Sequence, residues 1–160
     1  MAANGLMYTV SFGSVSLPNA ATGIFEISAA SCAVLIHSIR VTFIPTITSG
    51  IAQDVRLPLQ SARITTLGSG GSATTPRPVN SRNTLTPSGT YNTMNTTPGT
   101  TGNILDQELV SVIVPFERIF TPDQRIVVPQ GTFWALKLSG TGTPAGSTFV
   151  TSGELYVEEI

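Results

Sequence analysis

The sequence predicts an all-β protein, a two-sheet antiparallel β-sandwich that is most simply a jelly roll. About eight short runs alternate apolar and polar residues, and Gly, Pro, Ser and Thr separate them. Charged residues make up only 11% of the 160 residues, whereas the chain holds 15 Gly and 11 Pro. No segment has the periodicity of an amphipathic helix. The length suits a single domain over residues 1–160, and an up-and-down barrel is the alternative architecture.

Three strands are expected in the first third of the chain. Leu6–Phe12 alternates apolar and polar residues, and Ile24–Ser28 follows the turn-rich segment PNAATG. Ala33–Ile44 is the longest candidate, and Pro45 should end it, because proline lacks the N–H that a sheet ladder needs. Its predicted apolar face holds Leu35, His37, Ile39, Val41 and Phe43.

The fourth expected strand is Asp54–Thr65. Its apolar phase slips between Leu59 and Ala62, which predicts a β-bulge near Gln60–Ser61. Pro58 within it predicts an edge strand or an unpaired position.

Four more strands are expected after residue 102. Trp134 shares a face with Leu136 and Leu138, so it should point into the core. In the last strand, Leu155 and Val157 should face inward and Tyr156 outward. The four runs are Leu109–Val114, Ile126–Val128, Thr132–Leu138 and Thr148–Val157.

Gly68–Gly102 interrupts this pattern with an almost wholly polar segment of Gly, Ser, Thr, Asn and Pro. Insertions of this length are usually functional arms or disordered. Too few apolar residues are present to form a core, so the insertion is expected to be mobile or laid across another surface. We expect it to bind a neighbour by strand addition, with Arg77 and Arg82 pairing with carboxylates. A disordered or self-packed loop is the alternative, and GSGGS at its start is expected to be a flexible hinge.

The residues that usually carry catalysis are sparse. The sole histidine, His37, is expected to be a half-buried structural residue, and the sole cysteine, Cys32, a small buried apolar one. No pair of carboxylates follows a hydrolase or metal-binding pattern, so the acidic residues are expected to be solvated on the surface. The sequence therefore predicts a protein that is not an enzyme and has no cofactor or metal.

Charge also limits the classes of partner. The net charge is −1 and the basic residues are scattered, so we expect no nucleic-acid binding. No apolar run approaches a membrane span, and the start has no signal-peptide pattern. Synthesis in the cytoplasm without secretion or membrane association is expected.

Four segments resemble, in their order along the chain, small β-sandwich virion-associated proteins of tailed bacteriophages: YTVSFGSVSLPNAATGIFEI, HSIRVTF, GSGGSATTPRPVN and SGELYVEEI. The resemblance implies a capsid decoration (cement) protein on the outer surface of the virion. Its partner would be the major capsid protein, and proteins of this kind often form homotrimers. The resemblance brings no catalytic residues with it.

Under this hypothesis, Arg77, Arg82 and Tyr91 are the expected contacts with the capsid or with neighbouring subunits. Pro58 and Tyr156 are the secondary candidates, within a trimer. A carbohydrate-binding or receptor-binding module on a head fibre or tail is the alternative function. A glycosidase or esterase is a third hypothesis, without a supporting motif.

Overall fold

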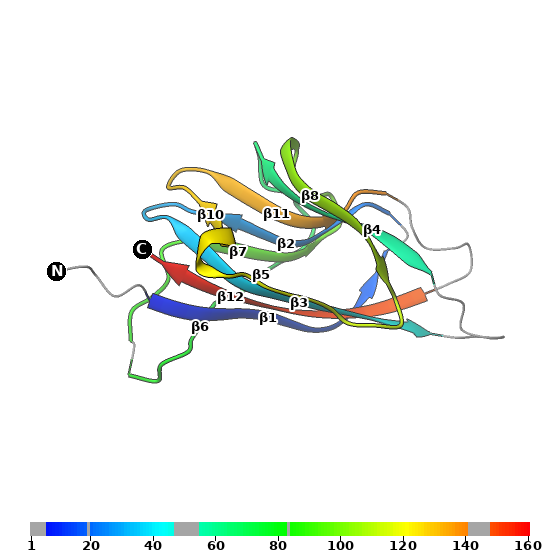
Figure 1. Ribbon diagram of the computed structural model, residues 1–160, viewed down its shortest axis with the longest axis horizontal. Helices are drawn as coiled ribbons and strands as arrows, with labels where there is room; N and C mark the ends of the chain where they lie inside the picture. Colours follow the sequence, from blue (N-terminus) through cyan, green and yellow to red (C-terminus); the bar gives the residue numbers. More distant parts are fainter. Residues whose placement is uncertain (1–5, 19, 47–54, 83, 141–147) are drawn as a thin grey trace.

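The computed structural model describes residues 6–18, 20–46, 55–82, 84–140 and 148–160. They form two six-stranded antiparallel sheets stacked face to face, with one 3-10 turn, η1 (Pro122–Gln124) (Figure 1). Sheet A contains β1 (Leu6–Leu17), β3 (Val34–Thr46), β6 (Arg77–Pro78), β9 (Phe116–Ile119), β10 (Ile126–Val128) and β12 (Thr148–Glu159). Sheet B contains β2 (Thr22–Ser28), β4 (Arg56–Ile64), β5 (Ser72–Ala73), β7 (Thr90–Asn95), β8 (Thr101–Ser111) and β11 (Phe133–Leu138). The predicted two-sheet sandwich is confirmed.

The strand order is that of a jelly roll. In sheet A, β1, β12 and β3 lie side by side, and both β9 and β10 pair with the far edge of β3. In sheet B the corresponding order is β2, β11, β4 and β8. The chain thus passes repeatedly from one sheet to the other, as in a pair of Greek keys. No pair among the described strands joins consecutive strands, which excludes the up-and-down barrel.

The core lies between the two sheets and is rich in aromatic side chains. Trp134 is fully buried, as predicted, and its Nε1 donates a hydrogen bond to Ser61 Oγ at 3.0 Å. A buried indole N–H needs such a partner. Leu155 and Val157 are also fully buried, whereas Tyr156 faces outward, as predicted. The largest fully buried side chains include Trp134, Tyr8, Tyr91, Phe25 and Phe149.

The prediction that Pro58 marks an edge strand or an unpaired position is wrong. β4 lies between β11 and β8, and Pro58 sits opposite Leu109 in the β4–β8 ladder. Its carbonyl accepts the backbone N–H of Ser139 at 3.0 Å. The register does shift at Ser61/Ala62, close to the predicted bulge, but the extra residue is Leu105, on β8.

The predicted faces of β3 are partly wrong. Val34 and Ile36 are buried at its start and Ile39 at its centre, so the inward phase changes between them. This change coincides with a register shift against β12 between Tyr156 and Val157. His37 consequently points away from the core and is half-buried, with Nε2 2.8 Å from Glu158 Oε2. The strand also continues past Pro45 to Thr46.

The insertion folds back onto the sandwich. β7 extends sheet B beside β2, β5 pairs with β7, and β6 pairs with β1. β7 was not predicted, because its sequence TYNTMN is mostly polar, and β8 begins at Thr101, within the segment predicted as loop. For the described residues, the self-packed alternative is the one observed. Cys32, predicted to be buried, is half-buried beside this segment, with Sγ 3.0 Å from Ser88 Oγ.

Gly153 on β12 gives a direct test of the core packing. A Cβ at this position would lie 2.6 Å from Phe12 Cε1 and 2.8 Å from Phe25 Cε2, in an edge-to-face ring pair. We expect Gly153→Ala to lower the free energy of unfolding by about 1 to 3 kcal/mol, because the rings must move. Urea unfolding measures the change, and Gly13→Ala is the control, since nothing lies within 4 Å of its Cβ. Equal stability of the two variants would contradict the packing described.

Candidate functional site

The five predicted contact residues do not form one site. Arg77 and Arg82 are exposed in the insertion. Tyr91, in contrast, is 2% exposed and lies in the core, so it is not part of the surface in this fold. Pro58 lies inside sheet B, as described above.

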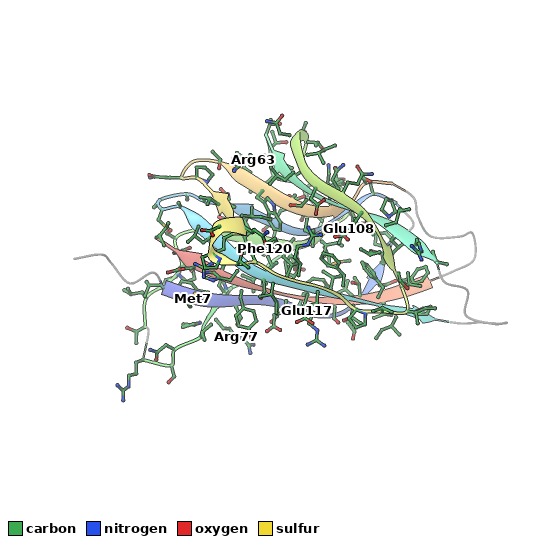
Figure 2. All side chains as sticks on the ribbon, viewed as in Figure 1. Met7, Arg63, Arg77, Glu108, Glu117 and Phe120 are labelled. Atoms are coloured by element: carbon green, nitrogen blue, oxygen red, sulfur yellow. The ribbon has the colours of Figure 1, made fainter. Side chains whose placement is uncertain are left out.

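The structure does bring Arg77 and Tyr156 to the same face of sheet A. Thr9 pairs with Tyr156 on one side and with Arg77 on the other, and paired residues share a face. Tyr156 is 37% exposed there. Figure 2 shows Arg77 on the outer side of this sheet.

A second surface, which the sequence did not reveal, lies at the side of the sandwich formed by β8, β9 and β10. A cavity of about 460 Å³ opens there between the two sheets, within the size range of ligand pockets. Figure 2 shows Glu108 and Phe120 in this region, between the two layers. We call it the β8–β9 cavity; its lining includes Ile39, Leu59, Ser61, Leu105, Asp106, Glu108, Phe116, Arg118, Phe120, Gln124, Ile126 and Leu136.

Three charged side chains meet at this cavity. Arg118 Nη2 donates to Glu108 Oε1 at 2.7 Å, and Arg118 Nη1 donates to Asp106 Oδ2. The register of the β4–β8 ladder explains why both carboxylates lie at the cavity: Asp106 is opposite Ser61 and Glu108 is opposite Leu59, and both of these partners line it. The hydrogen bond to Asp106 raises the pKa of Arg118, against the smaller opposing effect of burial, so the guanidinium remains charged.

Among the described residues, β8 forms one edge of sheet B and β5 the other. β8 carries unusual apolar exposure. Nearly half of the exposed large apolar side chains of the described residues fall within residues 104–119, a tenth of the chain. Concentrated exposure of this kind is typical of interaction surfaces. The strand and the segment after it expose Ile104 (55%), Leu105 (45%), Leu109 (62%), Ile113 (56%) and Val114 (63%).

Two buried carboxylates hold the insertion in place. Glu26 is 1% exposed; its Oε2 accepts the N–H of Gly68 at 2.6 Å and its Oε1 accepts the N–H of Gly99 at 2.8 Å. Glu26 therefore joins the two ends of the insertion. Its predicted position on the solvated surface is wrong, because loop N–H groups take the place of water as hydrogen-bond donors.

Glu159 holds the far part of the insertion in the same way. It is 8% exposed; Oε1 accepts the N–H of Gly89 and the hydroxyl of Tyr91, and Oε2 accepts the N–H of Ser88, each at 3.0 Å. The surface position expected for Glu159 is therefore also wrong.

Lys137 is a third buried charge, on the strand next to Glu26. It is 7% exposed, and its Nζ donates to Thr101 Oγ1 at the start of β8. Burial lowers the pKa of Lys137, while the charge of Glu26 acts in the opposite direction. The base of the insertion and the start of β8 are thus fixed by one group of buried polar contacts.

Tyr91 gives the fold a predicted sensitivity to alkaline pH. Burial and then the charge of Glu159 raise the pKa of Tyr91 above its ordinary value of 10.0. The unfolded chain loses this proton near its ordinary pKa, whereas the folded chain retains it. Tyr91 therefore contributes stability that is complete below pH 10 and lost as pH rises further, by up to about 1.4 kcal/mol per pH unit.

Urea unfolding measured between pH 8 and pH 11, in steps of about one pH unit, tests this expectation. The Tyr91→Phe variant is the control, because it removes the titrating group and should flatten the alkaline loss of stability. An unchanged slope in this variant would contradict the assignment.

No group of three His, Cys, Asp or Glu side chains in the described part of the chain is arranged to hold a metal ion. The described residues also contain no helix of the length and hydropathy needed to span a membrane. Comparison of the chain with protein-family models, curated proteins and solved structures finds no match.

Proposed function

We propose that this chain is a structural protein of a tailed-phage virion, a decoration (cement) protein that binds the major capsid protein on the outer surface of the head. The proposal assigns it no enzymatic reaction. It includes assembly as a homotrimer, in which the exposed Arg77 and Arg82 contact neighbouring subunits.

The observation that carries this proposal is the exposed apolar edge of sheet B. An edge strand offers backbone hydrogen-bonding groups to an extended segment, and exposed Leu109 and Ile113 offer apolar surface beside them. Such a surface favours binding to another protein over catalysis. The order of the four sequence segments supports the more specific assignment to a phage head.

A carbohydrate-binding module receives less support. Sugar sites commonly use exposed aromatic rings, but Trp134, Tyr8 and Tyr91 are all in the core. The chain has one Trp and three Tyr, and the fourth of these side chains, Tyr156, is only partly exposed.

The experiment that tests the function is sedimentation of the purified chain with expanded phage heads that lack it. Light scattering of the protein alone gives its mass. A trimer that sediments with the heads would support the proposal, whereas a monomer that stays in the supernatant would overturn it.

A pair of variants tests the surface. Leu109→Asp places a charge on the apolar edge and should weaken sedimentation with heads by about tenfold or more. Ile44→Asp is the matched control, since Ile44 is 52% exposed on sheet A, away from β8. If Leu109→Asp binds heads as well as Ile44→Asp does, the β8 edge is not the contact.

A further inference from the structure

We propose that the β8–β9 cavity takes a lysine or arginine side chain, presented by an extended segment of the protein partner that pairs with β8. This inference rests on the proposed function in one respect only, that the partner of this surface is a protein. It adds the chemistry by which the partner would be recognised.

The charge at the cavity favours a cation. Asp106 and Glu108 contribute two negative charges and Arg118 one positive charge, and no other ionisable side chain lines the cavity among the described residues. The net charge of the side chains that line the cavity is therefore negative. Arg118 already donates to both carboxylates, so an incoming anion would have to displace one of them. Asp106 and Glu108 are 44% and 39% exposed, so their remaining oxygen lone pairs can accept further hydrogen bonds.

The walls suit the apolar part of the same side chain. Leu59 and Leu136 come from sheet B, and Ile39 and Phe116 come from sheet A. Lysine and arginine bury their methylene groups against apolar surface while the charged end remains at a polar rim. A cavity with apolar walls and an acidic rim fits this division.

The geometry of β8 sets where the segment can pair. Residues 106–111 keep a regular ladder with β4, whereas two register shifts interrupt the ladder nearer Thr101. Bulges and inward-pointing charges are devices that limit indiscriminate pairing at sheet edges. A strand added beside residues 106–111 would place its inward-facing side chains next to Asp106 and Glu108, above the cavity.

A second copy of this chain is a poor occupant of the same edge. Pairing β8 with β8 of another copy would bring the carboxylates of Asp106 and Glu108 close to their equivalents. Like charges in adjacent positions on paired strands are destabilising. A basic residue of a different protein avoids this repulsion and neutralises the remaining charge.

Two capped pentapeptides serve as probes, Thr-Val-Lys-Val-Thr and the same peptide with Glu in place of Lys. Methyl resonances of Ile39, Leu59 and Leu136 in the full chain report binding at the cavity. We expect saturable shifts with the Lys peptide and affinity at least about tenfold weaker for the Glu peptide. Equal affinities, a preference for the Glu peptide, or no shifts would overturn the inference.

Variants give the sign of the charge effect. Glu108→Gln should weaken binding of the Lys peptide, and Arg118→Gln should strengthen it, because the cavity becomes more negative. Glu117→Gln is the control, since this exposed residue belongs to β9 but does not line the cavity. Urea unfolding identifies any variant that fails to fold, and the peptide comparison on the unaltered chain decides the question in that case.

Binding to phage heads distinguishes a failure of this inference from a failure of the proposed function. If heads bind the unaltered chain and the Asp106→Asn/Glu108→Gln double variant equally well, the cavity inference fails and the proposed function stands. If the Lys peptide binds but heads do not, the proposed function fails and the cavity inference stands.

Discussion

Replacing Glu26 by glutamine is expected to lower the free energy of unfolding by about 2 to 4 kcal/mol, because a charged acceptor of two buried hydrogen bonds is lost. Glutamine has one oxygen, so the N–H of either Gly68 or Gly99 would face an amide NH₂ group instead of an acceptor. The backbone at Gly99 is too tightly placed to move freely, since a Cβ there would lie 2.3 Å from the carbonyl oxygen of Thr66. Lys137 would also lose its nearby opposite charge.

Urea unfolding measures this loss, and hydrogen exchange locates it. Amide protection should fall at Gly68 and Gly99 more than in β12. Glu117→Gln is the matched control, because it removes the same charge from an exposed strand position. If both variants keep the stability of the unaltered chain, Glu26 does not hold the insertion.

Replacing Glu159 by alanine is expected to cost a similar amount, about 2 to 4 kcal/mol, since three donors lose their acceptor. The buried hydroxyl of Tyr91 has the most to lose, because the N–H of Ser88 lies nearer to solvent. Because Tyr91 and Glu159 contact each other, the double variant Tyr91→Phe/Glu159→Ala should be more stable than the sum of the two single losses predicts.

A double-mutant cycle from urea unfolding measures this coupling. Glu154→Ala on the same strand is the control for removing a carboxylate from β12. Additive losses from Tyr91→Phe and Glu159→Ala would contradict a direct interaction between the two side chains.

The strands that could be predicted are those whose own residues alternate between apolar and polar, because this pattern needs no information from the rest of the chain. Alternation around Val10 and Leu155, and the shared face of Trp134 and Leu136, marked strands whose inner faces meet the core. Gly and Pro separated the eight expected strands, but they did not reveal β5, β6, β7 or β9, which were not expected. These features predict that one-sided strands are covered by a second layer or by closure into a barrel, and the strand order, which the sequence does not show, decides for the sandwich.

What could not be predicted depends on contacts between distant residues. Glu26 has the sequence context of an ordinary carboxylate, and only the return of Gly68 and Gly99 to its side makes it buried. Pro58 has the usual signature of an edge strand, but its carbonyl bonds to Ser139, far along the chain. Local propensity cannot report either contact.

The candidate site was missed for the same reason. Asp106 and Glu108 lie two residues apart, which places both on one face of a strand. That spacing was visible in the sequence. Arg118, however, lies on β9 in the other sheet, and only the packing of the two sheets brings it to both carboxylates.

The position of β12 has a consequence for how the protein folds. This strand lies between β1 and β3, so most of sheet A depends on a strand that follows them by more than a hundred residues. During synthesis, β1 and β3 leave the ribosome long before the strand that separates them. Proteins dominated by such distant pairings fold slowly, on a scale of about milliseconds to seconds or longer. The half-formed sandwich therefore exposes its inner aromatic face until the final strand enters, and this stage should set both the folding rate and the exposure to chaperones.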